Sequence, residues 1–187
     1  MKWSWHQLAE SGRPVKINRT MDLSDELVTR DPDEILSADP MKVRATVRYA
    51  FGKVLITARI TGRLTVPSSR SLVPVRLPMN FQFKEIYVRS DYELRRYLKE
   101  HSNGDTVLTP DQNGEIDFNK SIIDNVILQI PTQVLSPKEK RDHLMPKGQG
   151  WNVISEDQYR HPKATESKKV DPRLAKLKYY FSNNKKK

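Results

Sequence analysis

The stretch from Met41 to Phe83 reads MKVRATVRYAFGKVLITARITGRLTVPSSRSLVPVRLPMNFQF. Apolar residues occupy alternate positions in three of its segments, residues 43–49, 54–66 and 73–83. A period of two residues is the pattern of β-strands that have one buried and one solvated face. The stretch therefore predicts a three-stranded antiparallel meander, with a turn at residues 51–53 between the first two strands.

Two features qualify this meander. Gly62 interrupts the second strand and indicates a bulge, because glycine inside a strand marks a local break in the pairing. Pro74 and Pro78 cannot donate ladder hydrogen bonds, which predicts that the third strand is an edge or irregular.

The solvated side of the meander is strongly basic. No acidic residue occurs between Met41 and Lys84, and the polar positions carry Arg44, Arg48, Arg59, Arg63 and Arg76. At the ~4.8 Å spacing of neighbouring strands, these arginines are expected to lie a few ångströms apart laterally. Facing like charges cost folding free energy unless carboxylates or phosphates neutralise them, and guanidinium groups match phosphate geometry. Two interpretations stay open: a nucleic acid binds this face, or the acidic segments 21–40 or 100–159 lie across it.

Composition narrows the class of protein. The chain has 187 residues, 36% hydrophobic and 30% charged, and its formal net charge of +10 favours polyanionic partners, nucleic acid before anionic membrane. It has no apolar run of about 18 residues and no apolar segment at its start that resembles a signal peptide. Cysteine is absent, which excludes disulfides, thiolate metal sites and cysteine nucleophiles. We expect a cytoplasmic protein with no membrane partner.

The remaining segments predict an α+β fold. The clearest helix covers residues 117–130, capped by Asp117 or Asn119 and stopped by Pro131, and its apolar stripe is expected to cover the apolar face of the sheet. Residues 91–100 are expected to form a second, charged helix, and Trp3 and Trp5 are expected to dock on the core.

The predicted organisation is one α+β domain over residues 1–160, followed by a basic flexible tail over residues 161–187 with a short helix near 172–181. The domain is expected to comprise an acidic loop at 21–40 with one helical turn near 33–36, the sheet at 41–90, the helix at 117–130 and an irregular segment at 131–160.

The residues that could carry out catalysis are scattered. No two of the histidines stand at metal-ligand spacing: His6, His101, His143 and His161. Glu115 and Asp117 could pair as acid and base, but strand termination and helix capping account for them better. The serines at 68, 69 and 71 lie in a turn without a nucleophile-elbow pattern. We therefore expect a protein that is not an enzyme and that uses no cofactor and no metal.

Three segments carry motifs of one known protein family. Residues 60–72, ITGRLTVPSSRSL, resemble the family's strand followed by a Cys-x-Arg-Cys-Leu turn, with Ser68 and Ser71 where the cysteines stand. Residues 115–118 and 127–131, EIDF and ILQIP, are similar to its Glu-Ile-Asp-Leu and Ile-Leu-Ala-Leu-Pro segments. Residues 171–177, DPRLAKL, match the closing Asp-Pro-Arg-Leu-Ala-x-Leu of its Gram-positive branch. Together these segments resemble the YceD family, the large-subunit ribosomal RNA accumulation proteins.

The resemblance also shows a departure. Many members of this branch carry further cysteines in a zinc-like arrangement, and Ser136, Met145 and Gly148 occupy what look like the corresponding places, so no thiolate remains. Arg70 is retained from the first motif. The resemblance implies a non-enzymatic role in accumulation or processing of large-subunit (23S) ribosomal RNA, and hence in ribosome assembly in a bacterial cytoplasm.

The resulting hypothesis is that the protein binds large-subunit ribosomal RNA, or a pre-ribosomal particle, through phosphates. The residues expected to contact phosphates are Arg44, Arg48, Arg59, Arg63, Arg70 and Arg76, and those expected to supply a second contact are Lys176, Lys178, Lys185, Lys186 and Lys187. The alternative is an assembly adaptor that docks a ribosomal protein or an assembly enzyme without touching RNA.

Overall fold

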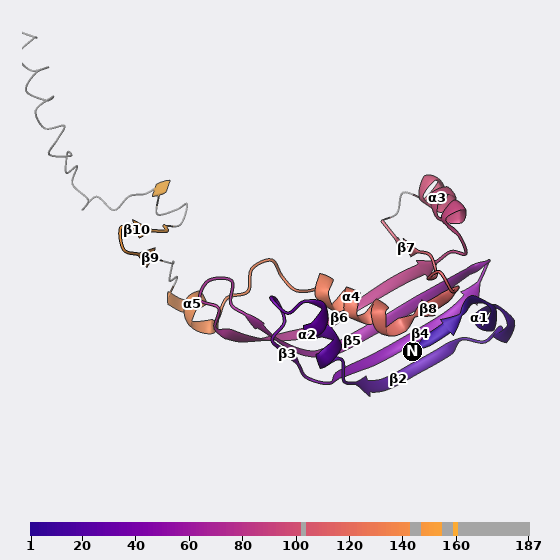
Figure 1. Ribbon diagram of the computed structural model, residues 1–187, viewed down its shortest axis with the longest axis horizontal. Helices are drawn as coiled ribbons and strands as arrows, with labels where there is room; N and C mark the ends of the chain where they lie inside the picture. Colours follow the sequence, from indigo (N-terminus) through magenta and orange to yellow (C-terminus); the bar gives the residue numbers. More distant parts are fainter. Residues whose placement is uncertain (102–103, 143–146, 155–158, 161–187) are drawn as a thin grey trace, which may run out of the picture. The chain divides into compact units, whose positions relative to one another are not determined.

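The computed structural model describes residues 1–101, 104–142, 147–154 and 159–160 (Figure 1). The chain divides into two compact units, Met1–Arg141 and Asp142–Lys187, which are taken one at a time below.

A mostly antiparallel mixed sheet organises the first unit, with the strand order β2-β4-β5-β6-β7 (Figure 1). These strands are β2 (Val15–Met21), β4 (Met41–Ala50), β5 (Lys53–Pro67), β6 (Pro74–Tyr87) and β7 (Thr106–Leu108). The expected meander is β4, β5 and β6, to which β2 adds an antiparallel edge and β7 a short parallel one. The two-residue strand β3 (Ser37–Ala38) pairs with the far end of β5. The predicted α+β class is thus confirmed.

Alternation along the strands decides which face is buried. Val47, Ile56 and Ile60 are fully buried, and the pairing register sets Val47 directly opposite Ile56. Because side chains alternate between faces, this register sends Met41, Val43, Ala45, Val47 and Tyr49 of β4 to one side and every charged residue of the strand to the other.

The free edge of the sheet lies along most of β6. Strand β7 pairs only with Glu85–Tyr87, so among the described strands the segment from Pro74 to Lys84 has β5 as its single neighbour. Pro74 and Pro78 both lie in this segment, where a missing amide hydrogen breaks no ladder. The expectation that the prolines mark an edge is confirmed.

The sheet has an irregularity beside Gly62, but the extra residue belongs to the neighbouring chain, because β5 itself pairs with β6 without a break through Gly62–Met79. The ladder between β4 and β5 ends at the pair Lys42–Thr61, and the ladder between β3 and β5 begins at Ala38–Leu64, so residues 39–41 stand opposite residues 62–63. A Cβ placed on Gly62 would lie 2.8 Å from Cγ of the fully buried Met41. Gly62 therefore allows Met41 to pack against the backbone of β5.

Helices cover the apolar face of the sheet. Leu8 of α1 (Trp5–Ser11), Leu27 of α2 (Ser24–Arg30) and Ile122 of α4 (Phe118–Leu128) join one core with the strand residues. The Asp117 side chain accepts hydrogen bonds from the backbone N–H groups of Asn119 and Lys120, as expected for the cap of α4. The helix ends at Leu128, two residues before the expected boundary.

The remaining elements join or flank the sheet. Helix α3 (Asp91–Glu100), which matches its expected range, connects β6 to β7, and the strand β1 (Lys2–Ser4) pairs with β8 (Glu115–Asp117). The rings of Trp3 and Phe118 lie 5.6 Å apart and those of Trp5 and Tyr49 5.9 Å apart. Both tryptophans therefore dock on the core, as the sequence predicts.

The acidic segment 21–40 is more ordered than the sequence suggests. It was expected to be a loop with one helical turn near 33–36, but it forms α2 and then β3. Leu23 and Leu27, four residues apart, are both buried against the sheet, and so is Ile35. Tertiary burial of these few apolar residues outweighs a composition typical of loops.

The segment from residue 131 onward contains short elements where irregular chain was expected. Helix α5 (Pro137–Asp142) starts in the first unit, and in the second unit β9 (Lys147–Gly148) pairs with β10 (Trp151–Asn152). The expected helix near 172–181 and the tail at 161–187 lie outside the described residues. Within the described ranges, no helix is long and apolar enough to cross a membrane.

We predict that Gly62→Ala lowers the free energy of unfolding by about 1–3 kcal/mol, because the new methyl group overpacks a tight core contact. Chemical denaturation measures this change. In a Met41→Ala background, which removes the facing side chain, the same substitution should cost clearly less. Equal costs in the two backgrounds would contradict the contact between Gly62 and Met41 as the cause.

Candidate nucleic-acid interface

The face of the sheet opposite α1, α2 and α4 is lined by cations. We call it the basic face and define it by the exposed cations on the solvent side of β2, β4, β5 and β6: Lys16, Lys42, Arg44, Arg48, Arg59, Arg63, Arg76 and Lys84. No acidic residue of these four strands points to this side, since Glu85 has the opposite parity and is buried. The basic face therefore joins residues from three strands of the meander and from β2, which lies outside it.

The pairing register arranges this face in rows that cross the strands. One row runs through Lys16, Thr46, Thr57 and Lys84, a second through Asn18, Arg44, Arg59 and Gln82, and a third through Thr20, Lys42, Thr61 and Asn80. A shallow depression of about 390 Å³ lies along the first two rows. Charged, hydroxyl and amide groups thus form an ordered polar grid.

The arginines are more widely spread than expected. Arg44 stands directly opposite Arg59, but Arg48 faces Leu55 and Arg63 faces Pro78. Arg76 faces Thr65, ten residues along β5 from the position of Arg48, which is a distance of roughly 33 Å. The expectation that all five arginines lie a few ångströms apart is therefore wrong for this register. Only Arg44 and Arg59 face each other directly, so the repulsion between arginines is strongest at this pair.

Acidic segments neutralise this face at two positions among the described residues. Arg76 Nη2 lies 3.0 Å from Asp39 Oδ2, and Lys84 Nζ lies 3.5 Å from Asp105 Oδ1. Helix α2, which carries other acidic residues of segment 21–40, packs on the opposite face. The hypothesis of self-shielding thus holds for the ends of the basic face and not for the centre.

The centre of the basic face has few internal partners. The Arg59 guanidinium donates to Asn80 Oδ1 from both Nε and Nη2, at 3.2 and 3.1 Å. Arg44 has no hydrogen-bond or ion-pair partner among the described residues. Because two guanidinium groups face each other across β4 and β5 without a carboxylate between them, an external anion can lower the repulsion.

Arg70 is separate from this face. It lies in the turn between β5 and β6, whose backbone is held by the buried hydroxyl of Ser68: Ser68 Oγ accepts from Arg70 N at 3.2 Å and donates to Glu139 Oε2 at 2.6 Å. The segment before α5 crosses this turn, since Ser69 N donates to Val134 O and Val134 N donates to Ser69 Oγ, both at 2.8 Å. We call these contacts the serine–glutamate clasp.

Glu139 is the centre of the clasp. It was not singled out from the sequence. Ser136 N donates to Glu139 Oε2 at 2.6 Å and Glu139 N donates to Ser136 Oγ at 3.3 Å, which is a capping box that opens α5. The sequence signal is Ser136-Pro137-Lys138-Glu139, with proline at the first helical position. Hydrogen bonds from Ser68, Ser71 and Ser136 outweigh burial and lower the pKa of Glu139 to about 2.

The clasp does not fit a metal centre of the zinc type. Ser68 and Ser136 stand at two of the places where the resemblance implies cysteine, but both hydrogen-bond to Glu139, whose buried Oε1 alone lacks a partner among the described residues. Zinc takes thiolate, imidazole or carboxylate ligands, and serine hydroxyls are not among them. Of the other three places, Ser71 offers only a hydroxyl, Gly148 has no side-chain donor and Met145 lies outside the described residues.

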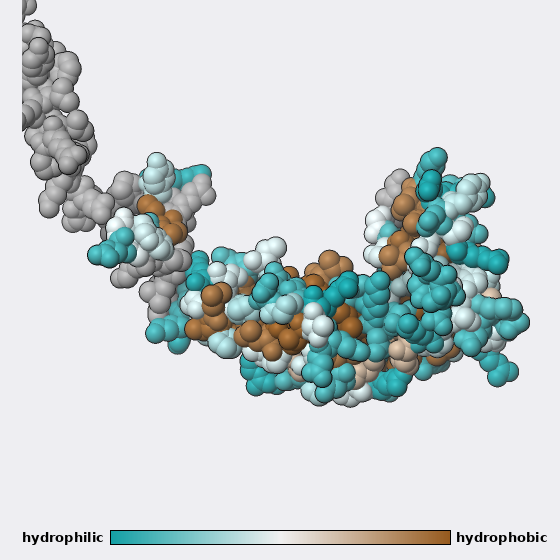
Figure 2. Space-filling model, in the orientation of Figure 1, coloured by the Kyte–Doolittle hydropathy of each residue, from teal (hydrophilic) through white to brown (hydrophobic). Residues whose placement is uncertain are grey.

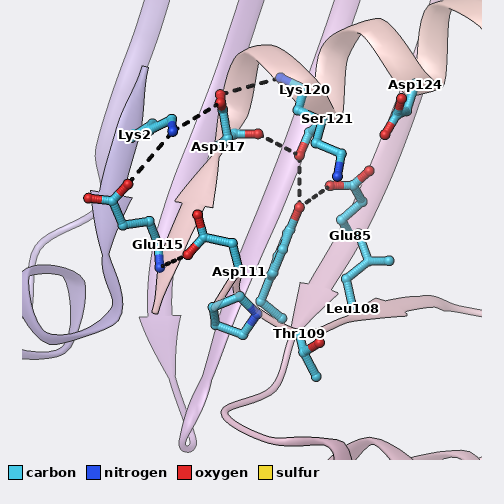
Figure 3. A pocket seen from close by; sticks show the side chains of 12 residues that line it. Lys2, Glu85, Leu108, Thr109, Asp111, Glu115, Asp117, Lys120, Ser121 and Asp124 are labelled. Carbon is cyan, nitrogen blue, oxygen red and sulfur yellow. Dashed lines mark hydrogen bonds and ion pairs between the residues drawn. The ribbon is translucent and has the colours of Figure 1, made fainter. Parts of the chain in front are cut away.

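A separate acidic pocket of about 440 Å³ lies beside α4 and β8 (Figure 3). Its carboxylates have structural partners. Asp111 Oδ1 accepts from the backbone N–H groups of Asn113 and Glu115, and Asp117, which is 3.9 Å from Lys2 Nζ, caps α4.

Glu85, the buried carboxylate of this pocket, is also satisfied. It accepts from Asn125 Nδ2 at 2.6 Å and from the Tyr87 hydroxyl at 3.2 Å. Burial is the main cause that raises the pKa of the Tyr87 phenol, so the hydroxyl stays a donor. The interpretation of Glu115 and Asp117 as structural residues thus agrees with their contacts, although the capping is done by Asp117 and Glu115 lies in β8.

Exposed apolar residues gather on the helix-covered side. Figure 2 shows hydrophobic residues around α2 and α4 and toward the turn between β5 and β6. Leu72 in that turn is 73% exposed and Leu128 at the end of α4 is 77% exposed. Between them, Leu72, Ile130 and Val134 line a hollow of about 260 Å³.

Comparison with known proteins supports the resemblance stated above. A sequence model of the family described as "Large ribosomal RNA subunit accumulation protein YceD" matches residues 56–179, which is more than half of the chain. The chain belongs to the YceD family. It is similar to the protein YlbN of Bacillus subtilis (strain 168), with 26% identity over 179 residues that cover 95% of this chain and 94% of YlbN. No solved structure matches the chain.

The YceD match covers part of the basic face and all of the clasp. It includes Arg59, Arg63, Arg70 and Arg76, and both Ser68 and Glu139. Strands β2 and β4, with Lys16, Lys42, Arg44 and Arg48, precede it. The predicted contacts at Lys176, Lys178 and Lys185–Lys187 lie outside the described residues.

We predict that Arg44→Gln raises the free energy of unfolding by about 0.2–1 kcal/mol at low salt, because it removes repulsion from the facing Arg59. The gain should vanish near 1 M salt, where charges are screened over about 3 Å. Arg48→Gln is the matched control, since Arg48 faces Leu55. An equal gain in both variants, measured by urea denaturation, would contradict a pairwise repulsion.

We predict that Glu139→Gln destabilises the protein at neutral pH, because a buried charge that accepts several hydrogen bonds is lost. Folding lowers the pKa of Glu139 from 4.5 to about 2, so the ionised clasp stabilises fully above pH 4.5 and loses this contribution as pH falls toward 2. The difference in melting temperature between the variant and the original protein should therefore shrink over that range. Asp33→Asn, at an exposed carboxylate, should show no such convergence; a constant difference for Glu139→Gln would contradict the assignment.

Proposed function

We propose that this YceD-family protein is a non-enzymatic ribosome assembly factor of the bacterial cytoplasm, which supports accumulation of large-subunit (23S) ribosomal RNA by binding RNA phosphates on its basic face. The family description supplies the biological context. The observation that carries RNA binding is the pair of facing arginines, Arg44 and Arg59, on an exposed sheet without acidic residues at its centre.

The energetics of folding favour an external anion at this place. Burying the apolar side of β4 and β5 obliges their polar side to hold like charges opposite one another, at a cost of a few tenths of a kcal/mol or more. A phosphate that bridges two guanidinium groups replaces this repulsion with charge-assisted hydrogen bonds. The net charge of +10 adds long-range attraction for a polyanion.

Arg70 is a weaker candidate for the same function. The clasp fixes the turn that carries it, which would limit the entropy lost when the side chain meets an anion, but the turn lies beyond the strands of the basic face. We assign Arg70 to a peripheral contact, and the basic face to the main one.

A second candidate function is a protein-binding adaptor. The exposed Leu72 and Leu128, with the hollow near Val134, form an apolar surface on the side away from the basic face. The free edge of β6 offers unpaired backbone groups nearby. A ribosomal protein or an assembly enzyme could dock there, with or without RNA on the other side.

We predict that the protein binds large-subunit ribosomal RNA fragments with an affinity that falls steeply with salt concentration. Arg44→Gln and Arg59→Gln should each weaken binding across sequences and reduce the slope of log affinity against log salt by about one unit. Filter binding or fluorescence anisotropy of the full chain, from 50 to 200 mM salt, gives both quantities.

Arg30→Gln is the matched control, because Arg30 lies on α2, on the other side of the sheet, and pairs with Asp124. Its affinity and slope should equal those of the original protein. Slopes that stay unchanged in Arg44→Gln and Arg59→Gln would remove the basic face from the proposal, and a salt-insensitive complex with a ribosomal protein in the absence of RNA would favour the adaptor.

A further inference from the structure

The basic face lacks the groups that stack on bases. In β2, β4, β5 and β6, which the structure describes throughout, no aromatic side chain points to the solvent side between Lys16 and Lys84. The aromatic residues of β6, Phe81, Phe83 and Tyr87, belong to the core on the other face or pack against it. Surfaces that bind single-stranded RNA usually offer aromatic rings to successive unstacked bases. This face offers none.

One exposed ring lies beyond the strands, at the tip of a hairpin. Phe51 forms the tip of the hairpin between β4 and β5, where it is 97% exposed in a left-handed backbone conformation with φ of 53°. It stands past the end of the cross-strand rows, so it cannot form a continuous stacking platform with Arg44 and Arg59. It nevertheless provides a specific test of stacking.

Hydroxyl groups occupy the centre of the face instead. Thr46 stands directly opposite Thr57, with Lys16 next to Thr46 on β2 and Lys84 next to Thr57 on β6. The row therefore places two hydroxyls between two ammonium groups, whose strands are about 14 Å apart, or three strand spacings of about 4.8 Å. In the adjacent row the order is reversed, with Arg44 and Arg59 between the amides of Asn18 and Gln82.

This pattern matches the wide, shallow minor groove of an RNA double helix. That groove presents ribose 2′-hydroxyls along its floor and phosphates along its two margins, and proteins recognise it by shape and by contacts to these groups. Threonine hydroxyls both donate to and accept from a 2′-hydroxyl, and lysines on either side reach the two phosphate margins. The ion pair of Lys84 with Asp105, at 3.5 Å, is partly exposed, so a phosphate can displace Asp105, which keeps its hydrogen bond from the Tyr97 hydroxyl.

We infer that the basic face binds helical, double-stranded segments of RNA across their minor groove, with Thr46 and Thr57 on ribose hydroxyls and the flanking lysines and arginines on the phosphates of both strands. This inference rests on the proposed function, because it names the form of RNA that the same face recognises. It implies recognition of RNA shape with little reading of base sequence.

The test compares three nucleic acids of one sequence, bound by the full chain at a fixed low salt: an RNA duplex, its single strand, and the DNA duplex. We expect the RNA duplex to bind at least tenfold more tightly than the single strand, and more tightly than the DNA duplex, which lacks 2′-hydroxyls. Equal or tighter binding of single-stranded RNA, or equal binding of duplex RNA and duplex DNA, overturns the inference and leaves the proposed RNA binding standing. Absence of binding to all three overturns the proposed function.

Two kinds of variant separate the groups involved. Thr46→Val and Thr57→Val keep the shape and strand preference of the residue while removing one hydroxyl, so each should lower the preference for duplex RNA over duplex DNA by about three- to tenfold and leave the salt slope unchanged. Arg44→Gln should instead reduce the salt slope and leave the preference for duplex RNA over duplex DNA unchanged. An unchanged preference in both threonine variants overturns the minor-groove assignment.

Phe51→Ala is the control for stacking. If single-stranded bases stack on the hairpin tip, this variant loses affinity for the single strand by roughly tenfold or more. We expect its affinity for duplex RNA to match that of the original protein. A loss of duplex binding in this variant would overturn the placement of the RNA along the rows of Lys16–Lys84 and Asn18–Gln82.

Discussion

The structure depends on the pairing register of β5 with its two neighbours. The strand is fifteen residues long, and nearly its whole length is paired with β6 on one side and with β4 or β3 on the other. A shift of one residue in this register would bury Arg59 and expose Ile60, because side chains alternate strictly along a strand. Burial of Val54, Ile56 and Ile60 therefore determines at once where the core lies and where the cations must stand.

The charge pattern follows from this constraint and from the position of the acidic segment. Leu27 and Ile35 anchor segment 21–40 in the core, so most of its carboxylates stay on the helix-covered side. Asp39, at the end of that segment, is an exception and reaches Arg76. The protein thus separates its charges between two faces of one sheet, which keeps the centre of the basic face open to an external polyanion.

The clasp shows how a cross-link can be made without thiolates. Ser68 in the turn between β5 and β6, and Ser136 before α5, lie 68 residues apart in sequence and share one buried carboxylate. A carboxylate that accepts several short hydrogen bonds remains ionised well below neutral pH, so this contact persists under ordinary conditions. Its consequence is a fixed position for the turn that carries Arg70 and the exposed Leu72.

Several features were determined by the sequence alone, because they depend on local periodicity and turn chemistry. These are the three strands of the meander, the helix capped by Asp117 and the basic character of one face. The capping box of Ser136 and Glu139 was also readable, although it was overlooked. In each case neighbouring residues carry the signal.

Tertiary structure decided which of these residues meet. The sequence placed Arg44, Arg59 and Arg76 on one face, but only the register brought Arg44 opposite Arg59 and left Arg76 far along the strand beside Asp39. The sequence by itself also could not show that α2 forms in segment 21–40, or that Ser68 hydrogen-bonds to Glu139. These outcomes depend on burial and pairing between distant segments, whose free energies exceed the local preferences on which a reading of the sequence rests.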